Sequence, residues 1–150
     1  MNISVSHITS ASPRYQEVWD LREEILRKPL GLSLKNEDMS RDHRNTIFIA
    51  EHEGVIIGCV LMEPIDTDTA QLRAMAVYNE WQGKGIGRLL VQALEKYAAQ
   101  NGYKKVILHA RKVIHEFYKS MDYDIIGPEF TEVGIPHLNM EKGLNLDSLD

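Results

Sequence analysis

A glycine-rich stretch, Gln82-Gly83-Lys84-Gly85-Ile86-Gly87, is the part of the sequence best suited to chemistry. It lies between a strand-like segment, 71–77, and a run of apolar residues at helical spacing from 86 to 98. Glycine lets backbone amides approach a ligand without a Cβ in the way. The first amides of a helix lack intrahelical acceptors and lie at the positive end of the helix dipole. The stretch therefore predicts an anion site, most often one for phosphate, with Lys84 and Arg88 adding positive charge.

Two common phosphate motifs are excluded at single positions. The dinucleotide fingerprint G-x-G-x-x-G would need glycine where Arg88 stands. The P-loop would need glycine in place of Tyr78 and Ser or Thr in place of Gly85. Two alternatives stay open on the residues alone: a different nucleotide phosphate as ligand, or glycines that only let the loop and helix pack closely.

The loop and its setting resemble the GNAT superfamily of acyl-CoA-dependent N-acyltransferases. Their coenzyme A motif, Gln/Arg-x-x-Gly-x-Gly/Ala, is matched by Gln82, Gly85 and Gly87. The elements around the loop are also arranged in the family's order. A strand precedes the loop, and a long helix, a strand at 106–110 and a helix with Phe117-Tyr118 come after it. The resemblance therefore extends from about Ile3 to Lys142. Two further segments resemble the ElaA-like group, namely Leu26-Arg27-x-Pro29-Leu30-Gly31 and Phe130-x-Glu132-x-Gly134-Ile135-Pro136-His137-x-x-Met140.

The resemblance implies a fold, a cofactor and a partner. The fold is α+β, a mixed and mostly antiparallel sheet of six to seven strands flanked by helices, with two central strands that splay apart. Acetyl-CoA is the implied acyl donor, and the partner is a small-molecule or peptide amine. A homodimer is common among relatives. The implied pantetheine contacts are Met75, Ala76 and Val77, and the implied pyrophosphate contacts are Gln82, Gly83, Lys84, Gly85, Ile86, Gly87 and Arg88.

The resemblance also implies a general acid, Tyr118, which would be a further contact of the cofactor, lie near its thiol and donate a proton to the leaving thiolate. A phenol, with an ordinary pKa near ~10, is protonated at neutral pH and suits this step. Without the family context, an aromatic residue at helical spacing is more often a packing residue.

The general base is less clear from the sequence. Many relatives place a Glu on the strand before the loop, but Arg73 and Ala74 stand there. The remaining candidates are His109, Glu132 and His137, and histidine titrates near neutral pH. His137 is favoured because Pro136 fixes the backbone before it and because the ElaA-like segment includes it. For each histidine, a structural role is the more common alternative.

The elements needed to position these residues can be predicted from periodicity and turn residues. A weak first strand precedes a helix that starts near Tyr15 and is closed by Pro29 and Gly31, and a loop follows over 32–45. The strong helix after the glycine loop ends at Asn101-Gly102. We expect strands at 2–8, 46–51, 55–62, 71–77, 106–110, 124–126, 130–133 and 137–141, and a short helix over 113–121.

Length and charge limit the function classes. The chain has 150 residues, which favours a single domain over 1–150, folded over about 3–142, with a loose tail at 144–150. Lys and Arg number 17 against 22 Asp and Glu, and a net charge of −5 argues against a nucleic-acid partner. No signal peptide or membrane-spanning run is present, so we expect no membrane partner and a cytoplasmic protein.

Cysteine and histidine point away from redox and metal chemistry. The one cysteine, Cys59, excludes an intramolecular disulfide and lies in an apolar strand, where a packed thiol is expected. The six histidines show no zinc spacing, since Ile56 and Lys119 occupy the second histidine position of two H-E-x-x-H-like starts. No metal is expected. Two hypotheses remain: an acetyl-CoA-dependent N-acetyltransferase, and a non-catalytic acyl-CoA-binding or regulatory module of the same fold.

Overall fold

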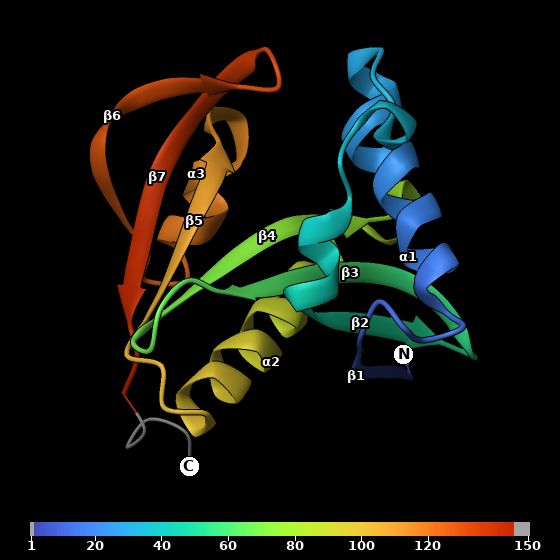
Figure 1. The fold of residues 1–150 in the computed structure, drawn as a ribbon, viewed down its shortest axis with the longest axis horizontal. Coiled ribbons are helices and arrows are strands. Elements are labelled where there is room, and N and C mark those ends of the chain that lie inside the picture. Colours follow the sequence, from blue (N-terminus) through green and yellow to red (C-terminus); the bar gives the residue numbers. More distant parts are fainter. Residues whose placement is uncertain (1, 146–150) are drawn as a thin grey trace. The chain divides into compact units, whose positions relative to one another are not determined.

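The computed structural model describes residues 2–145, so the end of the expected tail, 146–150, lies outside the described residues. Seven strands form one sheet in the order β1-β2-β3-β4-β5-β7-β6 (Figure 1). The strands are β1 (Ile3–Ile8), β2 (Thr46–His52), β3 (Val55–Pro64), β4 (Thr69–Val77), β5 (Lys105–Arg111), β6 (Asp124–Glu132) and β7 (Ile135–Gly143). The α-helices are α1 (Tyr15–Arg22), α2 (Ile86–Gln100) and α3 (His115–Lys119), and a π-helical turn, Glu23–Arg27, continues α1.

The sheet is mixed and mostly antiparallel, as the sequence predicts. The pairs β1–β2, β2–β3, β5–β7 and β6–β7 are antiparallel, whereas β4 and β5 are parallel. The register of β4 with β5 runs from Thr69↔Lys105 to Leu72↔Leu108. Strand β4 continues to Val77 and β5 to Arg111.

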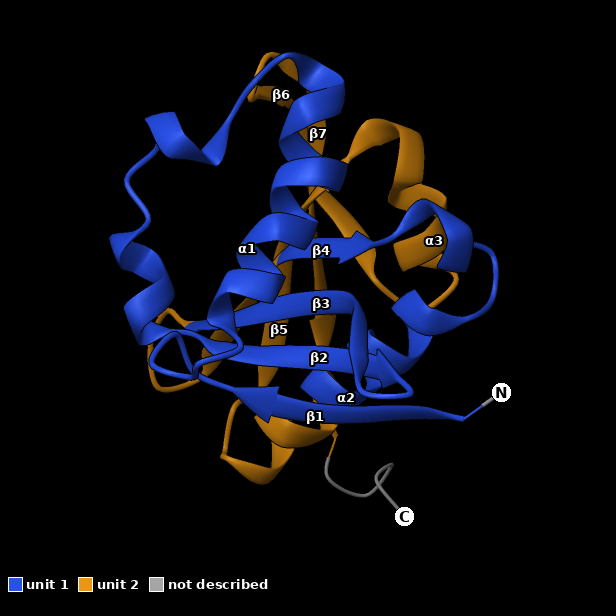
Figure 2. Cartoon of the chain, turned by 90° about the vertical axis from the view of Figure 1, so that its right-hand side faces the viewer, with its two compact units in different colours: residues 1–63, 74–94 blue, residues 64–73, 95–150 orange. Residues whose placement is uncertain are grey.

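The chain divides into two compact units (Figure 2). Unit 1 comprises residues 1–63 and 74–94, and unit 2 comprises residues 64–73 and 95–150. Strand β4 and helix α2 each contribute residues to both units. The single domain over 1–150 stays a prediction.

Unit 1 has an apolar core between α1 and the strands β2 and β3. Eight consecutive residues of β3 are buried, which is why its sequence is a continuous apolar run rather than an alternating one. The fully buried members of this core are Val18, Leu21, Ile47, Ile49, Ile56, Cys59, Leu61 and Ala76. A hairpin turn at Glu53-Gly54, both with positive φ, joins β2 to β3, as two-residue hairpins of the primed type require.

Unit 2 contains β5, β6 and β7. The sequence predicts separate strands at 124–126 and 130–133, but the structure joins them into one strand, β6, with a register shift between Ile126 and Phe130. The shift surrounds Gly127-Pro128. Proline lacks an N–H, and it is tolerated here because β6 is the last strand of the sheet. The β6–β7 hairpin closes through Val133-Gly134, where Val133 has φ of 47°, a strained value for a β-branched residue.

Candidate active site

The glycine loop of unit 1 forms an open cradle of backbone amides at the start of α2. Gly83 and Gly85 have φ of 76° and 82°, in the left-handed region that favours glycine. The first hydrogen bond of the helix runs from the Leu89 N–H to the Gly85 carbonyl at 3.1 Å. The N–H groups of Ile86, Gly87 and Arg88 therefore lack an acceptor within the helix and can bind an anion.

The side chain of Gln82 braces this loop. Its Nε2 donates to the Val77 carbonyl at 2.9 Å and lies 3.2 Å from Asn79 Oδ1. The glutamine of the motif thus ties the loop to the end of β4, which sets the direction in which the following amides point. Lys84 lies with its Nζ 5.2 Å from the centre of the Trp81 ring, so a positive charge stands beside the cradle.

Gly58 on β3 positions the first turn of α2, a role that was not predicted from the sequence. A Cβ at Gly58 would lie 3.0 Å from Ile86 Cγ2 and 3.1 Å from Leu90 Cδ1. The absence of a side chain therefore lets the helix approach the strand closely. The available signal was a glycine inside an otherwise apolar strand, which marks the close approach of another element.

The end of β4, where the sequence places the pantetheine contacts, carries a backbone irregularity. Ala74 has φ of 55°, and its carbonyl accepts a hydrogen bond from the Cys59 thiol at 3.6 Å. Met75, Ala76 and Val77 follow directly, and Ala76 is buried. Burial raises the pKa of Cys59 to about 12, so the thiol stays protonated and is not a nucleophile.

Tyr118 lies on α3 in unit 2 and is 3% exposed. Its ring contacts those of Phe117 and Tyr123 edge to face, with centroids 5.0 and 5.8 Å away. Within residues 2–145, its hydroxyl makes no hydrogen bond. Burial raises its pKa above the ordinary value for tyrosine. The phenol is therefore protonated at neutral pH.

The structure brings together the three base candidates, which come from different strands of unit 2. Glu132 lies with Oε1 3.0 Å from His109 Nδ1 and with Oε2 3.7 Å from His137 Nε2. His137 is 3% exposed, and its Nδ1 lies 2.9 Å from the Ile135 carbonyl. Because a carbonyl only accepts, Nδ1 carries the proton, and in the neutral ring Nε2 has the lone pair. Phe130 packs against both histidine rings, at 5.1 and 5.8 Å.

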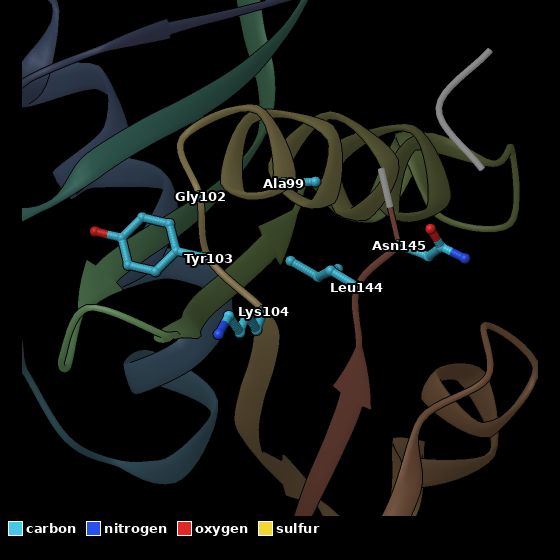
Figure 3. A pocket seen from close by; sticks show the side chains of 6 residues that line it. All are labelled: Ala99, Gly102, Tyr103, Lys104, Leu144 and Asn145. Atoms are coloured by element: carbon cyan, nitrogen blue, oxygen red, sulfur yellow. The ribbon is translucent and has the colours of Figure 1, made fainter. Parts of the chain in front are cut away.

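A surface pocket of about 330 Å³ lies elsewhere in unit 2 and holds none of the site residues predicted from the sequence. It is lined by the end of α2, the following turn and the residues after β7 (Figure 3), namely Ala99, Gly102, Tyr103, Lys104, Leu144 and Asn145. Over residues 2–145, no group of three or more His, Cys, Asp or Glu side chains could hold a metal ion. None of the helices in that range is long and apolar enough to cross a membrane.

A mixed sheet with an amide cradle at the start of its long helix is the architecture that the sequence predicts for an acyl-CoA-dependent N-acyltransferase. The family model for the acetyltransferase (GNAT) domain matches residues 12–144. The chain therefore belongs to the GNAT acetyltransferase family.

Individual proteins agree with this assignment. An uncharacterized N-acetyltransferase of Chlorobaculum tepidum is 33% identical over 89 residues, which cover 59% of this chain and 56% of that protein. The chain thus spans about half the length of the curated relatives that it matches.

Two solved structures show the same fold. The first is ElaA of Escherichia coli, with TM-score 0.81, 17% identity and 94% and 99% of the two chains covered. The second is a GNAT family acetyltransferase of Elizabethkingia anophelis with acetyl-CoA bound, with TM-score 0.68, 22% identity and 97% and 99% covered.

We predict that Gly58→Ala weakens acetyl-CoA binding more than it weakens folding. The added methyl pushes against Ile86 and Leu90 and displaces the first turn of α2, and overpacking of this kind costs roughly 1–3 kcal/mol. Thermal unfolding of the variant with and without acetyl-CoA measures both effects. The control is Gly143→Ala on β7, where a Cβ meets no atom within 4 Å. A ligand-induced shift equal to that of the unmodified chain would show that Gly58 does not position the cradle.

Proposed function

We propose that the protein transfers an acetyl group from acetyl-CoA to an amine by direct attack of the amine on the thioester. The observation that carries this proposal is the amide cradle formed by Gly83, Gly85 and the start of α2, in a chain of the GNAT family. The cradle suits a pyrophosphate, because backbone amides can bind an anion even though the chain carries a net charge of −5. Lys84 and Arg88 add local positive charge, and Met75, Ala76 and Val77 are assigned to the pantetheine arm.

The chemistry needs two proton transfers. The amine nitrogen attacks the thioester carbonyl carbon, a C–N bond forms, the C–S bond breaks and the amine loses a proton. His137 is proposed to take that proton at Nε2, with Glu132 favouring the imidazolium that forms. Tyr118 is proposed to give its proton to the departing thiolate. The buried phenol suits this role because it is protonated before the step.

The function is tested by binding and turnover measured separately. Acetyl-CoA should raise the unfolding temperature, whereas ATP and NAD should not, because a ligand of the native state stabilises it. Release of the coenzyme A thiol is then followed with spermidine, kanamycin and a peptide with a free N-terminus. A shift with acetyl-CoA but no thiol release with any amine would favour the non-catalytic module. A shift with ATP or NAD but not with acetyl-CoA would exclude both hypotheses.

We predict that Tyr118→Phe lowers kcat by about 100-fold, the lower end for loss of a general acid, and leaves the acetyl-CoA thermal shift unchanged. Since burial raises the pKa of Tyr118, the unmodified protein should keep this acid to at least about pH 10. The measurement is kcat against pH for both proteins. Equal turnover across that range would remove Tyr118 from the mechanism.

We predict that His137→Ala lowers kcat by about 100-fold and that Glu132→Gln lowers it less, because Glu132 acts on the base rather than on the amine. The control for His137→Ala is His7→Ala, because His7 is an exposed histidine on β1. Steady-state kinetics with the best amine of the panel gives kcat and KM for each variant. If His137→Ala behaves like His7→Ala, the base lies elsewhere.

A further inference from the structure

Among the residues that the structure describes, the proposed acid, Tyr118, is held by ring packing rather than by a hydrogen bond to its hydroxyl. Phe117 and Tyr123 contact its ring edge to face, and Phe117 is its neighbour in sequence on the same helix. An acid contributes to a rate only while it is held close to the atom that it protonates. The orientation of Tyr118 therefore depends on what fixes its packing partners, above all Tyr123.

The end of α3 forces Tyr123 against Tyr118. The Tyr123 N–H donates to the Tyr118 carbonyl at 3.1 Å, and the Asp122 N–H donates to the Lys119 carbonyl at 3.0 Å. Asp122 has φ of 73°, so these two bonds form a Schellman turn with Asp122 at its left-handed position. In this turn the residue after the left-handed one contacts the side chain five residues before it. Here that pair is Tyr123 and Tyr118, whose rings lie 5.8 Å apart at 75°.

Tyr123 is itself fixed by a charged network from two other elements of unit 2. Its hydroxyl donates to Glu95 Oε2 at 2.8 Å, and Lys142 Nζ lies 2.9 Å from Glu95 Oε1. The same Nζ lies 5.7 Å from the centre of the Tyr123 ring. Tyr123 is 1% exposed. Burial, followed by the Glu95 charge, raises the pKa of Tyr123, so its phenol keeps its proton and stays the donor in this bond.

The hydrogen bonds of Glu95 with Tyr123 and Lys142 hold the Tyr123 ring in one orientation. Each carboxylate oxygen of Glu95 has its own donor, and the Glu95 and Lys142 side chains are 13% and 23% exposed. Shielding from water strengthens such hydrogen bonds, so the Tyr123 ring has little freedom to turn. We infer that Tyr123, anchored by Glu95 on α2 and Lys142 on β7, is a positioning residue that orients Tyr118 for proton transfer to the leaving thiolate. The inference rests on the acid role proposed above for Tyr118.

The test is a double-mutant cycle with Tyr123→Phe, which keeps the ring contact and removes the bond to Glu95. With the best amine of the panel, we expect kcat to fall roughly three- to ten-fold, the size of one lost hydrogen bond, with KM for acetyl-CoA unchanged. In a Tyr118→Phe background the same change should have no further effect, because the residue through which it acts is gone. Tyr103→Phe, which also removes one hydroxyl from unit 2, is the control.

The outcomes separate the inference from the proposed function. An equal fall of kcat in both backgrounds would mean a general structural role and would overturn the inference, as would no fall at all. Tyr118→Phe alone reports on the acid role, without reference to Tyr123.

A second readout needs no substrate. Fluorotyrosine labelling with ¹⁹F NMR identifies the Tyr118 signal by its loss in Tyr118→Phe. Tyr123→Phe should shift or broaden that signal, and Lys142→Met, which keeps the aliphatic stem, should do so to a smaller extent. An unchanged Tyr118 signal in Tyr123→Phe would overturn the inference whether or not Tyr118 is the acid.

Discussion

The close approach of α2 to β3 at Gly58 is the constraint on which the proposed cofactor site depends. Ile86 and Leu90 lie where a side chain at Gly58 would have to go. Ile86 is also the first residue of α2, so its packing fixes where the unpaired amides of the helix begin. Gln82 fixes the other end of the same loop through its bond to the Val77 carbonyl. Apolar packing and the hydrogen bonds of the Gln82 side chain together hold the amides in place before a ligand arrives.

A buried ion pair holds together another part of unit 1. Arg22 on α1 and Asp42 in the 3-10 helical turn Ser40–Arg44 are 3% and 1% exposed. Arg22 Nη1 lies 2.7 Å from Asp42 Oδ2, and the Tyr15 hydroxyl donates to the same oxygen. Within residues 2–145, the Arg22 Nε has no hydrogen-bond partner, so the pair is not fully satisfied. Such a pair adds little net stability, but losing one partner leaves a buried charge, so it fixes one arrangement of loop and helix.

The sequence predicted the elements that carry strong periodicity or clear turn residues. Helix α2 and the paired strands β2 and β3 have long apolar patterns and were found nearly to their ends. The join across Gly127-Pro128 was missed, because a proline normally ends a strand and only the edge position of β6 tolerates it. Contacts between residues far apart in the sequence could not be predicted from local patterns. The contact of Gly58 with Ile86 and the hydrogen bond between Glu95 and Tyr123 join residues whose separation in the sequence follows no regular spacing.

The two proposed proton-transfer groups are held in opposite ways, and their tasks explain the difference. An acid must release its proton, and Tyr118 is positioned through ring contacts with Phe117 and Tyr123, so within residues 2–145 no side chain accepts a hydrogen bond from its hydroxyl in competition with the leaving thiolate. A base must present a lone pair in a fixed direction, and the bond from His137 Nδ1 to the Ile135 carbonyl leaves Nε2 as the acceptor. That bond lies within β7, directly after the β6–β7 turn, where Val133 is held in a strained backbone conformation. The side chains on either side of this turn meet, with Glu132 Oε2 3.7 Å from His137 Nε2, so the hairpin brings the carboxylate to the nitrogen that is proposed to take the proton.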